Sequence, residues 1–172
     1  IAYVSADNGH QVAVIRYQNN AWEPVGNLST ESIAYQPSLI FNQNNELYLS
    51  YSYTDNSIPF LIKPKSKLCT YSTNQWSNCG ATLEGQFVSL ALTVDNDLYL
   101  AYNHNTGLSS TDGLTVQYFN VGLNAFQAVG TAPIAAAGMA SSIVLCADSS
   151  DLYLAFVDSL QNNKLSVMQY DG

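Results

Sequence analysis

Single aspartates occur in loops that follow apolar segments, and their carboxylates are the groups in this sequence best suited to bind a cation. They are Asp7, Asp55 and Asp158. A calcium ion takes about six to eight oxygen ligands, so one aspartate per loop would make a site only if several loops converged. An aspartate in a loop more often accepts hydrogen bonds from neighbouring backbone N–H groups. We therefore expect three structural turn aspartates and predict no metal site.

Carboxylates could also act in pairs, as the acid and base of a glycosidase. Such enzymes hold two carboxyl groups roughly 5 to 9.5 Å apart. Four glutamates fall at different positions of the repeat described below, so their spacing identifies no pair: Glu23, Glu31, Glu46 and Glu84. The sequence also contains no cysteine and histidine spacing typical of a zinc site. We predict a protein that is not an enzyme and has no cofactor.

Two of the three cysteines lie close together in the sequence. Cys69 and Cys79 flank a predicted turn at Asn74, so they could form a cross-strand disulfide or remain two reduced thiols in the core. We expect Cys146, on a predicted inner strand, to be a small buried apolar side chain. Asn27 begins the only sequon, Asn27-Leu28-Ser29, which makes it a candidate for N-glycosylation in a secreted glycoprotein.

The composition narrows the class of protein. Charged residues make up 10% of the chain, against roughly 25% in an average globular protein, and uncharged polar residues such as the 17 Asn take their place. This suits a secreted β-rich surface, so we expect an extracellular or cell-surface protein. With a net charge of −8, the chain has no basic stripe for nucleic acid. The uncharged stretch 130–147 is rich in Gly, Ala and Ser and contains Pro133, so we predict no membrane insertion.

A repeat of about 50 residues runs through the chain and must position these groups. Its clearest copies, at 46–51, 97–102 and 151–156, share Leu-Tyr-Leu, with spacings of 51 and 54. Ile1-Ala2-Tyr3 matches the end of this motif, and a tyrosine follows it and each of the three copies: Tyr17, Tyr71, Tyr118 and Tyr170. After all but the last of these tyrosines comes an aromatic residue with a glycine four positions on: Trp22 with Gly26, Trp76 with Gly80, and Phe126 with Gly130. Recurrence at fixed positions indicates that these aromatic residues pack within the fold rather than form a platform for sugars.

Each repeat is predicted to form four antiparallel strands. Short polar pairs between alternating apolar segments are typical of hairpin turns, and no segment has a sustained helical period. One such sheet cannot bury both faces, and four strands in about 50 residues favour a β-propeller-like array over a solenoid. We divide the single array 1–172 into a partial repeat 1–37, repeats 38–88 and 89–140, and a partial repeat 141–172.

Residues 48–51, residues 17–22 and Val25-Gly26 carry a pattern, Tyr-Val-Ala-Tyr-like and then Tyr-x-x-x-x-Trp-x-x-Val-Gly. This pattern resembles tandem β-propeller-type repeats of bacterial and other secreted or surface proteins. The resemblance covers the whole chain and implies a propeller, and most such repeats have no assigned activity. Ser5-x-Asp7-x-Gly9 also resembles the Asp-box loop of sialidase-like propellers, where the box is a fold element. A sialidase site needs an arginine cluster, but Arg16 is the only arginine.

By this division the chain begins inside the second strand of one repeat and ends after the third strand of another. We expect a fragment of a longer array, open edges that pair with a second copy or another protein, or four incomplete blades in a ring. The predicted function is that of a non-enzymatic extracellular repeat protein with a structural, adhesion or self-assembly role. The alternatives are a lectin-like carbohydrate-binding propeller, with glycans as partners, and thirdly a propeller glycosidase.

Overall fold

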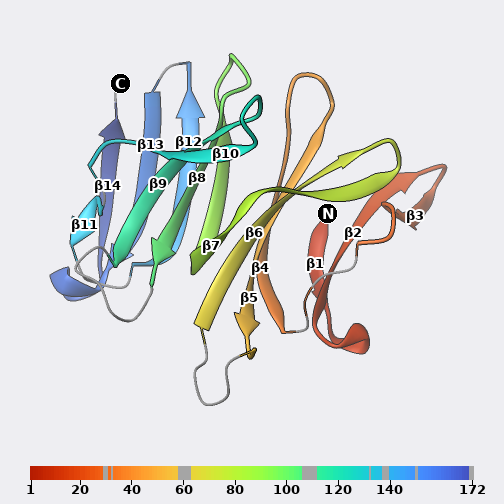
Figure 1. The fold of residues 1–172 in the computed structure, drawn as a ribbon, viewed down its shortest axis with the longest axis horizontal. Coiled ribbons are helices and arrows are strands. Elements are labelled where there is room, and N and C mark those ends of the chain that lie inside the picture. Colours follow the sequence, from red (N-terminus) through yellow and green to blue (C-terminus); the bar gives the residue numbers. More distant parts are fainter. Residues whose placement is uncertain are drawn as a thin grey trace.

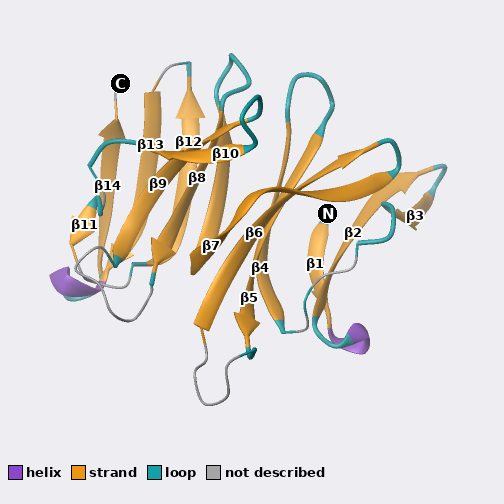
Figure 2. Ribbon diagram, in the orientation of Figure 1, coloured by secondary structure: helices purple, strands orange, loops and turns teal. Residues whose placement is uncertain are grey.

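The computed structural model describes residues 1–28, 31, 33–57, 63–105, 112–131, 133–136, 140–149 and 151–170. These residues form antiparallel strands joined by short turns (Figures 1 and 2). Within the described ranges the helical segments are two 3-10 turns, η1 (Ala6–Asn8) and η2 (Ser159–Gln161). The prediction of an all-β antiparallel fold is confirmed, and no sheet in this part of the chain closes into a barrel.

The strands form three sheets. The first contains β1 (Ala2–Ser5), β2 (Gln11–Gln18) and β3 (Ala21–Pro24) in that order. The central sheet has the order β10-β9-β8-β7-β6-β5-β4, with the short β11 also paired to β9; its bounds are β4 (Ala34–Phe41), β5 (Leu47–Asp55), β6 (Lys63–Ser72), β7 (Gln75–Leu92), β8 (Leu98–His104), β9 (Gly113–Asn120), β10 (Ala125–Ala128) and β11 (Ala135–Ala136). The third contains β12 (Ser141–Asp148), β13 (Asp151–Asp158) and β14 (Lys164–Tyr170).

The 18-residue strand β7 takes part in two successive ladders. Its residues 75–84 pair with β6 and its residues 85–92 pair with β8. The central sheet therefore divides into unit 2 (β4, β5, β6 and residues 75–84) and unit 3 (residues 85–92, β8, β9 and β10). We call the first sheet unit 1 and the last sheet unit 4. Unit 1 and unit 4 lie at opposite ends of the molecule in Figure 1.

The hairpin turns use residues that tolerate left-handed backbone. Asn19–Asn20 and Thr73–Asn74 each place two successive residues at positive φ, between 49° and 63°. Two positive φ angles are the mark of the type I′ turn, whose twist matches that of the flanking strands. In the β4–β5 turn, Asn42 Oδ1 instead accepts backbone N–H bonds from Asn44 and Glu46 at 3.0 and 2.8 Å.

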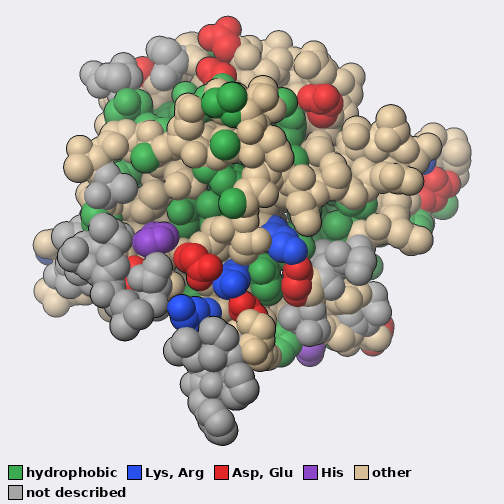
Figure 3. All heavy atoms as spheres, in the orientation of Figure 1, with side chains coloured by type: hydrophobic (Ala, Val, Ile, Leu, Met, Phe, Trp, Pro, Cys, Tyr) green, Lys and Arg blue, Asp and Glu red, His purple; other side chains and the backbone are tan. Residues whose placement is uncertain are grey.

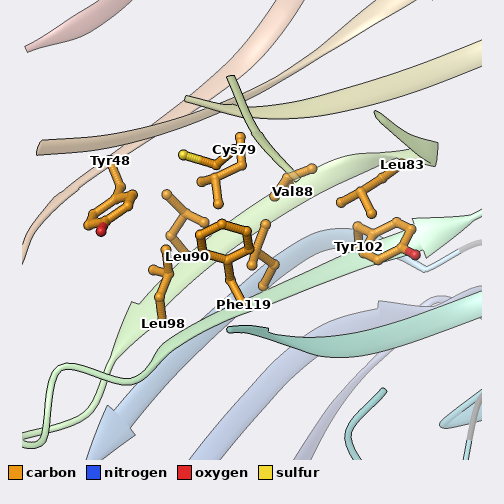
Figure 4. Close-up of a cluster of buried hydrophobic side chains, with 10 residues drawn as sticks. Tyr48, Cys79, Leu83, Val88, Leu90, Leu98, Tyr102 and Phe119 are labelled. Carbon is orange, nitrogen blue, oxygen red and sulfur yellow. The ribbon is translucent and has the colours of Figure 1, made fainter. Parts of the chain in front are cut away.

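The core consists of three clusters, one at each junction between successive units. A strand of unit 2 or unit 3 contributes side chains to the clusters on both sides of its sheet, because neighbouring side chains on a strand point to opposite faces. In β5, Leu49 and Tyr51 pack toward unit 1, whereas Tyr48 packs toward unit 3. Figure 4 shows this second junction, where Tyr48 and Cys79 of unit 2 meet Phe119 of unit 3. Stacking thus buries both faces of the inner units.

The register corrects one marker of the repeat. In unit 2, Tyr71 pairs with Leu47 on one side and Trp76 on the other. In unit 3, the residue with the equivalent pairs, Leu98 and Phe126, is Phe119. Phe119 therefore occupies the position that the sequence analysis assigned to Tyr118. Tyr118 points to the other face, where its ring centroid lies 5.4 Å from that of Tyr99. Two adjacent aromatic residues made the position ambiguous, and a shift of one residue on a strand reverses the face.

The structure distinguishes between the two alternatives for Cys69 and Cys79, and it corrects the expectation for Cys146. Cys69 pairs with Asn78 and Cys79 pairs with Leu68, so the two sulfur atoms lie on opposite faces of unit 2 and the candidate disulfide is not formed. Both thiols are buried, and burial raises the pKa of Cys69 to about 12 and that of Cys79 to about 11. Cys146 was expected to be buried, but it is exposed because it lies on the outer face of unit 4.

Candidate functional site

The aromatic residue and the glycine of the repeat meet across the junctions between units. Gly26 of unit 1 has a φ of +64°, and a Cβ atom built on it would lie 2.7 Å from Cε2 of Tyr71 in unit 2. Gly80 of unit 2 has a φ of +65°, and its Cβ would lie 2.7 Å from Cε2 of Phe126 in unit 3. Both the backbone conformation and the lack of space therefore require glycine here.

A pair of rings covers each of these glycines. The ring centroids are 5.1 Å apart for Tyr71 and Trp76, and 5.2 Å apart for Phe119 and Phe126. The indole N–H of Trp76 also donates a hydrogen bond of 2.7 Å to the backbone oxygen of Val25. The aromatic residue of one unit therefore packs on the glycine of the unit before it, and this contact joins the two units.

The junction between units 3 and 4 is only half filled. Gly130 has the same conformation, with a φ of +68°, but among the described residues the one atom within 4 Å of its Cβ position is Cε2 of Tyr170, at 3.9 Å. A mostly apolar pocket of about 360 Å³ opens here. It is lined by Val116, Val129, Gly130, Thr131, Ile134, Leu145, Leu152, Leu154, Met168, Gln169 and Tyr170. Within the described residues, no strand pairs with the outer edge of β14.

The equivalent rings of unit 1 face outward. Tyr17 and Trp22 have centroids 5.3 Å apart, like the pairs at the junctions. They are nevertheless 60% and 55% exposed. Ile1 and Tyr3 of the same sheet are also exposed. The outer face of unit 1 therefore displays the aromatic surface that inner units bury.

The outer face of unit 4 is apolar and exposed as well. Val144, Leu165 and Val167 are 57%, 70% and 67% exposed. The register places Val144 and Val167 on either side of Ala155, on the face opposite to the buried Leu154. The two ends of the molecule therefore carry two different apolar sheet faces.

A charged cluster lies at the ends of β5 and β6. Nζ of Lys65 lies 2.7 Å from Oδ2 of Asp55 and 3.6 Å from Oε1 of Glu84. Lys67 forms an ion pair with Glu31, which also accepts a 2.8 Å hydrogen bond from the hydroxyl of Tyr51. Figure 3 shows Lys and Arg side chains interspersed with Asp and Glu on the lower part of this face.

These contacts favour ionised carboxylates. The hydrogen bond from Lys65 holds the pKa of Asp55 well below its usual range, helped by bonds from Ser57. Burial alone would raise the pKa of Glu31, but hydrogen bonds from Lys67 and Tyr51 bring it below its ordinary value. A glycosidase acid must keep its proton near neutral pH, so neither carboxyl group is suited to that role.

The three predicted turn aspartates lie in three different units. Oδ1 of Asp55 accepts the backbone N–H of Ser57 at 2.9 Å, which is the bonding of a turn aspartate. Asp7 is exposed in η1, and Asp158 ends β13 opposite Lys164 in the ladder with β14. Among the described residues, no group of three or more His, Cys, Asp and Glu side chains could hold a metal ion.

A polar groove of about 660 Å³ lies where unit 1 meets unit 2, and is lined by Pro24, Gly26, Asn27, Asn74, Gln75 and Trp76. Asn27, the candidate for glycosylation, is exposed there, while Ser29 of its sequon lies outside the described residues. The groove was not predicted because its two sides are about 50 residues apart in the sequence. The repeat markers Trp76 and Gly26 were the signal that could have located it.

None of the helical segments described is long and apolar enough to cross a membrane. No family model matches the sequence, and no curated protein matches it. Among solved structures, the fold is similar to that of a xylan β-1,4-xylosidase from Bacillus halodurans C-125, with a TM-score of 0.54 and 13% identity. The match covers 94% of this chain and 35% of that chain, so this chain spans about a third of the enzyme's length. At this identity the likeness concerns the fold alone.

Proposed function

We propose that the chain is a β-propeller-like array of blades that acts as a non-enzymatic structural module and assembles with further copies of itself. The observation that carries this proposal is the pair of exposed apolar sheet faces, one on unit 1 and one on unit 4. Each unit corresponds to one blade, and the repeated glycine and ring contact gives successive blades the same relation. The likeness to part of a larger enzyme's fold is compatible with an array of this kind.

The two end faces are of complementary type. At each inner junction, the face that carries Tyr48 or Tyr99 packs against the leucine-bearing face of the next unit. Tyr153 of unit 4 stands at the position of Tyr48 and Tyr99 but on an outer face. The outer face of unit 1, with Tyr3 and Trp22, is equivalent to the leucine-bearing face of the other units. The outer face of unit 4 can therefore pack against the outer face of unit 1 in a second copy.

A contact between two different faces is heterologous, so it generates rings or filaments rather than an isolated dimer. This is the self-assembly role, and adhesion would follow if the assembly displayed its loops at a surface. The extracellular or cell-surface location is part of the proposal and is supported by the low charge content. The two buried free thiols give it no support, because a disulfide would have indicated an oxidising compartment.

Sedimentation velocity over a range of protein concentrations tests the proposal. We expect the chain to associate as its concentration rises, and the double variant Leu165→Asp with Val167→Asp to stay monomeric, because burying two carboxylates in an apolar interface is unfavourable. The matched control is Val121→Asp with Leu123→Asp, in the β9–β10 turn, where the original side chains are 62% and 67% exposed. This control should associate like the wild type. A wild-type chain that stays monomeric at every concentration contradicts the proposal.

A second candidate function is carbohydrate binding, and the polar groove between units 1 and 2 favours it. Its lining combines the ring of Trp76 with the side-chain amides of Asn27, Asn74 and Gln75. Amides donate and accept hydrogen bonds, as sugar hydroxyl groups require. Partly exposed rings combine an apolar face with a polar tip, which suits them to ligand surfaces.

A glycan array followed by calorimetric titration tests this candidate. We expect the double variant Asn27→Ala with Gln75→Ala to lose at least tenfold in affinity for any glycan that binds. Gln127→Ala, an exposed amide on β10 outside the groove, is the control and should bind unchanged. No binding on the array, or binding that the double variant retains, rejects the groove as a saccharide site.

A further inference from the structure

We propose that the polar groove between units 1 and 2 binds the acetamido group of an N-acetylated sugar on the backbone N–H of Gly26, and that the side chain of Asn74 can close this position. The inference rests on the second candidate function, carbohydrate binding. It names the class of ligand and the residue that keeps the position open, Tyr71. Two equivalent junctions that differ by one hydroxyl group lead to it.

The junction between units 2 and 3 shows the closed form of this position. Asn124 directly precedes β10, and its Oδ1 accepts the backbone N–H of Gly80 at 2.8 Å. Gly80 is the glycine of unit 2 that the ring of Phe126 covers. The turn of unit 3 thus places an amide oxygen on the junction glycine of unit 2, and this N–H is not available to a ligand.

The junction between units 1 and 2 contains the same two residues at equivalent positions. Asn74 directly precedes β7, as Asn124 directly precedes β10, and their φ angles of 63° and 48° are both left-handed. Gly26 and Gly80 have φ angles of +64° and +65°, and a pair of rings covers each of them. The same hydrogen bond is therefore expected between Asn74 and Gly26.

The structure shows a different arrangement. Oδ1 of Asn74 accepts the hydroxyl of Tyr71 instead, in a long hydrogen bond of 3.4 Å. Among the described residues, no oxygen atom accepts the N–H of Gly26. Phe119, the equivalent of Tyr71 in unit 3, has no hydroxyl group that could hold Asn124 in this way. The hydroxyl of Tyr71 is thus the chemical difference between the open and the closed junction.

The open position lies in the groove. Gly26 and Asn74 both line this groove of about 660 Å³. The N–H of Gly80 points to the turn of the next unit, so the N–H of Gly26, with the same backbone conformation, faces Asn74 across the groove. The residues that line the groove are all uncharged, which favours a neutral ligand. The side-chain amides of Asn27 and Gln75 can bond to its hydroxyl groups.

The closed junction indicates which ligand group suits the open one. The acceptor on the N–H of Gly80 is the oxygen of an amide, and the acetamido group of an N-acetylated sugar carries the same kind of oxygen. Its methyl group would meet the indole of Trp76, whose Cδ1 and Nε1 lie 3.3 and 3.4 Å from the Cβ position of Gly26. A sugar without this group offers neither the amide oxygen nor the methyl contact.

Nuclear magnetic resonance of the full chain tests the closure without any ligand. Tyr71→Phe removes only the hydroxyl group and reproduces the ring of unit 3, so Asn74 should close on Gly26. Exchange of the Gly26 amide proton with water should slow about fivefold, the change in population that one hydrogen bond produces. Tyr71→Phe with Asn74→Ala is the matched control and should exchange like the wild type. Unchanged exchange in Tyr71→Phe overturns the proposal.

Titration with two disaccharides tests the ligand. N,N′-diacetylchitobiose should shift the amide resonance of Gly26 and the indole resonance of Trp76. Cellobiose has the same linkage without the acetamido groups and should bind at least tenfold more weakly. Tyr71→Phe should weaken binding of diacetylchitobiose about fivefold, and Asn74→Ala in that background should restore it. Circular dichroism must show that both variants are folded.

The outcomes separate this inference from the functions proposed above. Equal binding of the two disaccharides, or binding of neither, overturns the assignment of the acetamido group. A glycan of another class that binds on the array and depends on Asn27 and Gln75 would leave the groove a saccharide site and reject this inference alone. Self-assembly is independent of both, because it uses the outer faces of units 1 and 4.

Discussion

The indole N–H of Trp76 donates a 2.7 Å hydrogen bond to the backbone oxygen of Val25, which lies 51 residues earlier in the chain. The bond therefore joins unit 2 to unit 1. It ties the start of residues 75–84, the last strand of unit 2, to the residue that directly follows β3, the last strand of unit 1.

Replacing Trp76 tests how much this bond contributes. Trp76→Phe should lower the free energy of unfolding by about 1 kcal/mol, the usual net contribution of one hydrogen bond, because Phe126 shows that a phenyl ring still packs at this position. Urea unfolding followed by circular dichroism measures the difference. Trp22→Phe is the control, since Trp22 is exposed, and it should change stability by less than about 0.5 kcal/mol. An equal loss in both variants would contradict the role of the bond.

The junction glycines should not tolerate even a methyl group. Gly80→Ala should lower the free energy of unfolding by roughly 2 to 4 kcal/mol, because the new Cβ would displace the ring of Phe126 and a positive φ would be strained. Gly9→Ala is a matched control: its φ is +62°, but no atom of the described residues lies within 4 Å of its Cβ position. It should lose about 1 kcal/mol from backbone strain alone. If the two variants were equally stable by urea unfolding, the ring contact would not matter.

Two buried serines of β5 should behave in opposite ways. The hydroxyl of Ser50 is fully buried and has no partner among the described residues, and the equivalent positions in the other repeats are Ala101 and Ala155. Ser50→Ala should therefore raise the free energy of unfolding by about 1 kcal/mol.

Ser52→Ala should lower that free energy by about 1 kcal/mol, because the hydroxyl of Ser52 lies 3.0 Å from that of Ser66, which donates to the oxygen of Gly85. Thermal unfolding of both variants under identical conditions provides the comparison. A loss of stability in Ser50→Ala would show that its hydroxyl has a partner after all.

The two buried thiols should make the protein less stable at alkaline pH. The pKa values of Cys69 and Cys79, about 12 and about 11, exceed the value of about 8.5 expected for a thiol in the unfolded chain. Below a pH of about 8.5 the two protonated thiols therefore make their full contribution to the free energy of unfolding. It is then lost progressively as the pH rises through the folded values. Urea unfolding between pH 7 and pH 10 should show falling stability, and the slope should be smaller in Cys69→Ala with Cys79→Ala.

A thiol reagent provides the control for this prediction. In the folded protein at pH 8, one thiol should react rapidly, because Cys146 is exposed while Cys69 and Cys79 are buried. Cys146→Ser should abolish this rapid reaction and leave the alkaline slope as it is in the wild type. Rapid reaction of three thiols would contradict the burial of the unit 2 pair.

The sequence predicted the class of fold and the strands because the repeat carries strong local signals. Leu-Tyr-Leu alternation and asparagine turns act between neighbours in the chain, and they determine the hairpins directly. The partition of the cysteines could not be predicted, because one residue of register decides which face of the sheet Cys79 occupies. The marker at Tyr118 was wrong for the same reason.

The groove and the pocket depend on contacts between neighbouring units, which the sequence of a single repeat does not reveal. The recurrence of Trp76 and Gly26 indicated packing, but only the stacked units show that the ring of one repeat lies over the glycine of the previous one. The pocket beside Gly130 lies next to an edge of β14 with which no other strand of the described residues pairs, and the burial of a sheet edge cannot be deduced from local propensity. The exposure of Cys146 has the same origin, since it depends on what covers unit 4.

The continuous course of β7 through two ladders has a consequence for the energy landscape of the molecule. Breaking the pairing of residues 75–84 would release the strand that also holds β8, so units 2 and 3 should melt together as one cooperative block. Units 1 and 4 pack on that block through side chains at the junctions, but among the described residues they share no strand ladder with it, so they can fray separately. Hydrogen exchange should therefore find one slow central domain between two faster ends, and mechanical force applied at the ends should peel the outer units away before the middle yields.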